Sequence, residues 1–197
     1  MAKLTLDDIS DLRAYERERV DFRREVIGVK QRRRVGLGEF VTLLFENAQT
    51  IRFQIQEMAR AEKIISDEGI ETELAIYNPL IPEPGQLCAT LFIELTSKDA
   101  LVEWLPRLVG IESAVALRLA DGELVRAVVD EDHGKQLTRD EITASVHYVR
   151  FELTPEQVER FAAGSVTLLS DHPAYTAEVA LGDETVAELT TDLRHGG

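Results

Sequence analysis

The sequence predicts an α+β protein with a long N-terminal helix and a helical region, then an antiparallel-rich sheet with helices on one side. Three observations predict it: a charged amphipathic pattern opens the chain, three prolines between positions 79 and 84 interrupt it, and short strand patterns follow from Leu87. A chain of 197 residues is long enough for one domain with its own core. We divide this single domain, residues 1–197, into an amphipathic helical arm (1–34), a mainly helical part (35–85) and an antiparallel sheet with helices (86–197).

Residues 6–33 are predicted to form one long helix. Thr5 is a typical N-cap residue, and Asp7 and Asp8 follow in the first turn, where the helix dipole favours acids. Apolar side chains then recur with helical spacing at Ile9, Leu12, Tyr15, Phe22, Val26 and Val29. Such a stripe must be covered by the same chain or by another, so we expect a homodimer or a protein partner at this helix.

The segment "KQRRR", residues 30–34, closes this helix, and Gly36 and Gly38 are interpreted as its glycine stop. Its cations either complement the helix C-terminus or form a patch for an anion, a nucleic acid or a partner. The net charge of the whole chain is −14, and residues 1–34 carry +3 of it, so the remainder carries −17. Such an acidic body repels phosphates, which weighs against nucleic-acid binding.

The elements before the proline loop are a strand at 41–45 and two helices. Residues 50–56 are ambiguous, because Ile51, Phe53 and Ile55 alternate as in a strand. The same stretch also starts a helical face that continues through Met58 and Ile65, and the helix formers around it favour a helix to about residue 67. A second helix is expected near residues 70–76, ending before "YNPLIPEPG".

The C-terminal part is predicted from turns and caps. Asp121-Gly122 between two apolar runs is a strong hairpin signal, and "TPEQ" at 154–157 is a capping box with proline at the first helical position. The expected strands cover residues 87–95, 114–119, 123–129, 144–153, 166–169 and 175–181, and the expected helices 99–108, 155–163 and 183–194.

Composition excludes several classes of site. Cys88 is the single cysteine, which rules out an intrachain disulfide and any cysteine-rich metal site. The sequence has no apolar stretch long enough to span a membrane and no signal-peptide core, so we expect a soluble, cytoplasmic protein. It also lacks Glu-x-x-His, His-Glu-x-x-His, phosphate-loop and Gly-x-Ser-x-Gly motifs, which mark familiar enzyme families.

Two histidines are the best candidates for chemistry. The period of residues 144–153 places His147 on the same face as Val149 and Phe151, where it is either a ligand or acid–base group or a satisfied core residue. His172 lies between Asp171 and Pro173 in a turn-like stretch. If the two strands are neighbours, His147, His172 and a carboxylate such as Asp171 would form a site for a divalent metal such as iron or zinc. The acidic run "DEDH" at 130–133 is either a cation site or a solvated loop.

A dense polar set on the central helix gives a second candidate: Gln54, Gln56, Glu57, Arg60, Glu62 and Lys63. If that helix crosses the sheet, some of these side chains would line a pocket with Tyr77 and Asn78 from the proline loop. The alternative is a solvated helix face with intrahelical ion pairs.

Six phrases of the sequence resemble an uncharacterised bacterial family, domain-of-unknown-function family 3501, from about Leu4 to Leu181. They are "LTLDDISDLRAYERERVDFRREVI", "RRRVGLGEFVTLLFEN", "IRFQIQEMARAEKI", "YNPLIP", "SVHYVRFELT" and "DHPAYTAEV". The resemblance implies a bacterial cytoplasmic protein encoded beside rubrerythrin-like and iron–sulfur oxidoreductase genes, hence a redox or metal-handling context. It brings no established activity, cofactor or catalytic residue.

Together these observations favour a non-catalytic binding or accessory protein that docks a partner through its N-terminal helix. The alternative is a metal-dependent redox or hydrolytic enzyme with a site near His147 and His172. A weaker third hypothesis is nucleic-acid binding through Arg32–Arg34.

Overall fold

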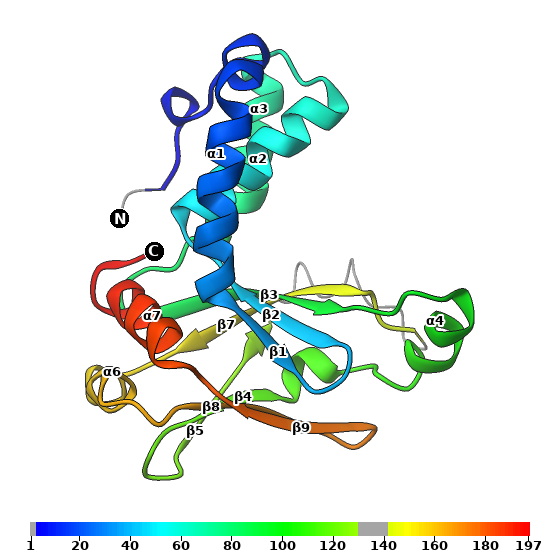
Figure 1. The fold of residues 1–197 in the computed structure, drawn as a ribbon, viewed down its shortest axis with the longest axis vertical. Helices are drawn as coiled ribbons and strands as arrows, with labels where there is room; N and C mark the ends of the chain where they lie inside the picture. The colour runs from blue at the N-terminus through cyan, green and yellow to red at the C-terminus, as the bar shows by residue number, and fades with distance from the viewer. Residues whose placement is uncertain (1–2, 130–141) are drawn as a thin grey trace.

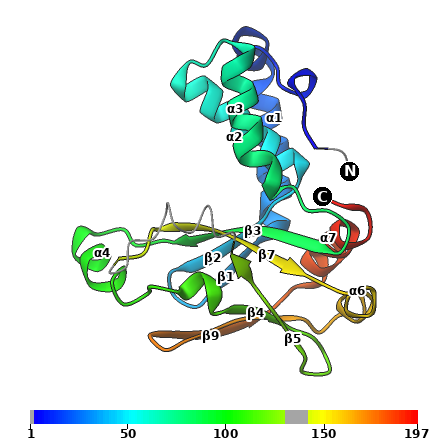
Figure 2. The same ribbon diagram turned by 180° about the vertical axis from the view of Figure 1, so that it is seen from behind.

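The structure is a computed structural model that describes residues 3–129 and 142–197. It has the predicted α+β architecture: two antiparallel sheets lie in layers, and a helical arm rises from one of them (Figures 1 and 2). The N-terminal elements are η1 (Leu6–Asp8), α1 (Leu12–Arg33), β1 (Arg34–Leu37), β2 (Val41–Phe45), α2 (Ala48–Glu62), α3 (Asp67–Tyr77) and η2 (Asn78–Leu80). The rest are β3 (Gln86–Ile93), α4 (Lys98–Trp104), η3 (Ile111–Ser113), β4 (Val115–Arg118), β5 (Leu124–Arg126), β6 (Val128–Val129), β7 (Val146–Glu152), α6 (Pro155–Ala162), β8 (Thr167–His172), β9 (Tyr175–Ala180) and α7 (Asp183–His195).

The first sheet has the strand order β1-β2-β3-β7-β6, and the second has the order β5-β4-β8-β9. Alternate side chains of the first sheet, including Leu43, Leu91 and Phe151, point inward and meet Leu117 and Leu168 of the second sheet in one hydrophobic core. The opposite, outer face of the first sheet carries the arm (Figure 1).

The predicted hairpin at Asp121-Gly122 is present, and Gly122 adopts the positive φ that its turn requires. The single strand expected at 123–129 is wrong, because the segment divides between the sheets. Residues of β5 pair with β4 in the second sheet, whereas Val128 and Val129 pair with β7 in the first. Strand β1 was also not predicted: α1 passes directly into it, and Gly36, which was expected to stop the helix, pairs with Thr42.

Residues 50–56 are helical, which settles the ambiguity of the sequence. Asn47 caps α2 by accepting a hydrogen bond from the Thr50 backbone N–H. Helix α2 lies along α1, so that Tyr15 and Val26 of the predicted stripe are buried within the chain (Figure 1). Ile9, Leu12 and Phe22 of the stripe are only partly buried. The other face of α1 exposes Val20 and Ile27. The dimer stays a prediction.

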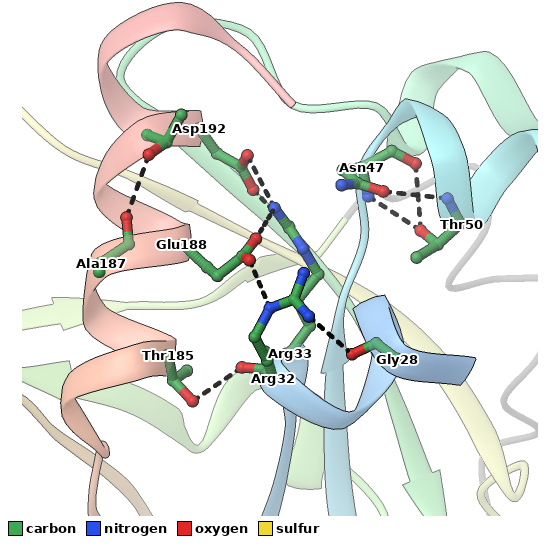
Figure 3. A network of polar contacts seen from close by, with 10 residues as sticks. Gly28, Arg32, Arg33, Asn47, Thr50, Thr185, Ala187, Glu188 and Asp192 are labelled. Carbon is green, nitrogen blue, oxygen red and sulfur yellow. Dashed lines mark hydrogen bonds and ion pairs between the residues drawn. The ribbon is translucent and has the colours of Figure 1, made fainter. Parts of the chain in front are cut away.

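The end of α1 is fastened to α7 by a buried ion pair (Figure 3). Arg33 binds Asp192 with Nη1–Oδ2 at 2.5 Å and Nη2–Oδ1 at 3.0 Å, and it also contacts Glu188. Arg32 pairs with the same Glu188, and Arg34 pairs with Glu94. All three arginines of the basic segment thus have carboxylate partners in their own chain, which removes the reason for a nucleic-acid patch there.

Among residues 3–129 and 142–197, no helix combines the length and the apolar composition that crossing a membrane requires.

Arg33→Met is expected to lower the free energy of unfolding by about 3–5 kcal/mol, because Asp192 would be left as a buried charge without its partner. The double variant Arg33→Met/Asp192→Leu should recover most of this loss, since it removes both charges. Urea unfolding followed by circular dichroism measures both effects. Arg24→Met, which removes an exposed pair with Asp21, is the control and should change stability by less than about 1 kcal/mol. Equal losses in the single and double variants would contradict the assignment.

The arm itself is held by Glu57 of α2. Its carboxylate accepts a hydrogen bond from the Tyr15 hydroxyl at 2.7 Å and is bound by Arg19 through Nε at 2.8 Å and Nη2 at 2.9 Å. These contacts, that of Arg19 first, lower the pKa of Glu57 to about 2. The folded state therefore binds this proton less readily than the unfolded chain does.

Glu57→Gln should accordingly destabilise the protein by about 1–3 kcal/mol at neutral pH. The lost contribution is present above about pH 4.5, the ordinary value, and disappears as the pH falls towards about 2. Unfolding curves measured across this range should therefore converge for the wild type and the variant at acidic pH. Glu62→Gln, at an exposed carboxylate of the same helix, should show neither effect. A constant difference at every pH would refute the linkage.

Candidate functional site

His147 lies on β7 and faces the core between the sheets, as predicted. Its Nε2 is 2.9 Å from the Ala144 carbonyl oxygen, which can only accept, so this nitrogen carries the proton in the neutral ring. The Thr143 hydroxyl contacts the same nitrogen, and Nδ1 lies 3.9 Å from Oε2 of Glu112. Burial lowers the pKa of His147, against an opposing effect of the Glu112 carboxylate.

His172 ends β8 in the second sheet and is also buried. Its Nε2 is 3.1 Å from the Val109 carbonyl oxygen, and its Nδ1 accepts a hydrogen bond from the Ala174 backbone N–H. The preceding Asp171 is exposed and binds Arg126, which lowers the pKa of the Asp171 carboxyl. Adjacent residues of a strand point to opposite faces, so Asp171 and His172 do not share a site.

The predicted metal site of His147, His172 and Asp171 therefore finds no support in this geometry. Within the described part of the chain, no three His, Cys, Asp or Glu side chains are grouped so that they could hold a metal ion. The run "DEDH" at 130–133 lies outside the described residues. The iron or zinc site stays a prediction.

A cavity at the foot of the arm is the stronger candidate, and we call it the base cavity. Its floor is the outer face of the first sheet, where the pleat brings alternate side chains of three strands together. Leu44, Thr90 and Tyr148 form one cross-strand row, and Phe92 and Val146 are paired beside it. The volume of the cavity is about 340 Å³, which is typical of a site for a small molecule.

The walls of the base cavity come from the arm and from the end of β2. They comprise Lys30 of α1, Glu46, Ile51 and Gln54 of α2, Tyr77 of α3 and Leu80 of η2. Gln54 and Tyr77, which the pocket hypothesis for the central helix placed together, both line this cavity. Gln56 of the same polar set binds Ser10 instead, and Asn78 of the proline loop binds Leu4.

Glu46 is a buried carboxyl group in this wall. Oε2 lies 2.5 Å from the Thr50 hydroxyl and Oε1 lies 2.6 Å from the Thr90 hydroxyl. Burial raises the pKa of Glu46, against the opposing effect of these two hydrogen bonds. The Thr50 hydroxyl also lies 3.0 Å from the Asn47 carbonyl oxygen, so it can donate there and accept the proton of a neutral Glu46. The site therefore accommodates the protonated acid without an unsatisfied group.

The other polar groups of the cavity are a cation and two phenols. Lys30 Nζ lies 5.1 Å from the centre of the Phe53 ring, and no carboxylate of the described residues forms an ion pair with it. Burial raises the pKa of Tyr148 to about 12 and also raises that of Tyr77. Both phenols are therefore protonated at neutral pH and can donate hydrogen bonds.

The comparisons with known proteins agree over nearly the whole chain. A family model described as a protein of unknown function, DUF3501, matches residues 3–193. A solved structure of a protein of unknown function from Burkholderia pseudomallei K96243 is 40% identical, with a TM-score of 0.90 over 98% of this chain and 100% of that chain. No curated protein matches. The resemblance drawn from the six sequence phrases is thereby confirmed, and no activity comes with it.

Glu46→Gln should raise stability relative to the wild type by an amount that grows with pH. Because the folded state holds the Glu46 proton more tightly than the unfolded chain, the wild type loses stability as the pH rises from about 4.5 through the raised pKa. Glutamine has no such proton and keeps the hydrogen bonds with Thr50 and Thr90. The difference in the free energy of unfolding should increase as the pH rises above about 4.5, and urea unfolding at a series of pH values measures it. A pH-independent difference would show that Glu46 ionises normally.

Proposed function

We propose that this chain, which belongs to the DUF3501 family of proteins of unknown function, is a non-catalytic binding protein that holds a small, largely apolar molecule in the base cavity. One observation carries the proposal. Apolar side chains such as Leu80, Phe92 and Val146 converge there with a few donors and one buried carboxyl group, which is the make-up of a small-molecule site.

Binding is favoured over catalysis by the chemistry of the groups in reach. Tyr77 and Tyr148 have raised pKa values, so neither phenol is poised to act as a base at neutral pH. Cys88, on the same face of the sheet, is buried, and burial raises the pKa of its thiol to about 11, so it is not an activated nucleophile. The metal-dependent enzyme remains the alternative, to be tested at His147 and His172 by metal analysis.

The position of the cavity explains what binding would do. A molecule in it touches α1, α2 and α3 on one side and β2, β3 and β7 on the other. Its contacts would therefore add to those that hold the arm on the sheet, and the arm would be steadier with the site filled. An accessory role, in which the arm meets a partner protein, is compatible with this effect, because the outer side of α1 exposes Val20 and Ile27.

The neutral fluorescent probe N-phenylnaphthylamine is expected to bind the full-length protein with micromolar affinity and gain fluorescence on leaving water. Val146→Trp, which fills the floor of the cavity, should weaken this binding at least about tenfold, equivalent to about 1.4 kcal/mol. Val20→Trp adds the same ring at an exposed position of α1 and should leave binding unchanged. Thermal unfolding confirms that both variants fold. If Val146→Trp binds the probe as the wild type does, or if no protein binds it, the proposal is overturned.

A further inference from the structure

We infer that the molecule held in the base cavity is a small carboxylic acid with a hydrocarbon body, whose carboxylate pairs with Lys30 while its body lies on Leu80, Phe92 and Val146. This inference rests on the proposed binding function and adds the chemical class of the ligand.

The positive charge of Lys30 favours an anionic ligand. Each of the neighbouring arginines forms an ion pair with a carboxylate. Arg32 and Arg33 pair with residues of α7, and Arg34 pairs with Glu94, which follows β3. Lys30, one turn before them, has an aromatic ring as its partner and no ion pair with a described carboxylate. It lies in the wall of a largely apolar cavity and is itself partly buried. Its charge acts on the nearby Glu46, where it opposes the rise in the pKa of that carboxyl, but the two groups form no ion pair, so an anionic ligand would supply a direct counterion.

Several polar side chains of the base cavity can donate hydrogen bonds to an anion. A carboxylate can only accept hydrogen bonds, and the phenols of Tyr77 and Tyr148 and the amide of Gln54 can all donate them. Tyr148 also has further interactions within the chain. Gln54 is also hydrogen-bonded to the Tyr77 hydroxyl, and each phenol has a hydrogen that an anion could accept.

Glu46 can occupy this wall as the neutral acid. Its two oxygens are already engaged by Thr50 and Thr90, and its environment accommodates the neutral acid. A protonated Glu46 carries no charge that would repel the ligand, whereas an ionised one would favour an amine. The choice between an acid and an amine is therefore the sharpest test of the inference.

The volume of the base cavity limits the size of the ligand. A volume of about 340 Å³ lies at the lower end of the range for small-molecule sites. It suits a body of roughly sixteen carbon atoms or fewer together with one polar end. An aromatic or branched-chain monocarboxylate meets both requirements, and its ring or branch matches the flat surface of Phe92.

The test compares three probes of one shape with the full-length protein by isothermal titration calorimetry: phenylacetate, phenylacetamide and phenethylamine. Phenylacetate is expected to bind at least about tenfold more tightly than the other two. Lys30→Gln should weaken phenylacetate binding about tenfold and phenylacetamide binding by much less, so that the acid loses its advantage over the amide. Glu46→Gln should bind phenylacetate at least as tightly as the wild type. Arg24→Gln, at an exposed cation further along α1, controls for net charge and should change none of these values.

Three outcomes overturn the inference. Equal affinity for the amide and the acid would show that charge plays no part, tightest binding of the amine would show that Glu46 governs the site, and no binding of phenylacetate would exclude the class. The fluorescence experiment with N-phenylnaphthylamine reports separately whether the cavity binds anything. If that neutral probe binds and the acid does not, the ligand class is wrong and the binding function stands.

Discussion

The central strands of the first sheet are buried on both faces, and this constraint shapes the rest of the molecule. Leu43 and Leu91 point into the core between the sheets, whereas Leu44 and Thr90 point outward and are buried as well. Burial of the outer face therefore requires a second covering layer, which the foot of the arm and α7 provide (Figures 1 and 2). The base cavity is the part of this face that the helices wall in without filling.

A layer of charged amphipathic helices can cover a sheet only if its charges are satisfied where they enter the interior. At the end of α1 the charge of Arg33 is satisfied, because its guanidinium forms a bidentate contact with Asp192 and also contacts Glu188 (Figure 3). The Tyr15–Glu57–Arg19 cluster does the same between α1 and α2. Buried ion pairs add little net stability over apolar packing, but they fix one arrangement of the elements, since every other arrangement strands a charge. We therefore assign to them the register of the arm on the sheet.

Local signals in the sequence predicted much of this fold. The cap at Thr154, the Asp121-Gly122 turn and the two-residue period around His147 each act within a few residues, and the structure agrees with them. Strand β1 was missed because Gly36 and Gly38 were interpreted as a helix stop, although β1 pairs with β2 across a short turn. The division of β5 from β6 was missed because strand pairing depends on distant partners. Only part of the base cavity was considered from the sequence, where a pocket with Gln54 and Tyr77 was one of two alternatives. The contact of Glu46 with Thr90 was not expected, because it depends on the pairing of β2 with β3 and no local pattern indicates that pairing.

The two histidines and the base cavity differ in how their ionisable groups are surrounded. His147 and His172 are buried, and their hydrogen bonds go to Thr143, to backbone carbonyls or to the adjoining turn, while Nδ1 of His147 lies 3.9 Å from Glu112 Oε2. Lys30 and Glu46 differ, because each places an ionisable group in a largely apolar cavity where a leucine would cover the sheet at lower cost. Stability alone therefore gives no reason for these two side chains at the foot of the arm. A ligand that pairs with the Lys30 ammonium and is compatible with the Glu46 carboxyl group would explain both side chains. It would bind where the arm packs on the first sheet.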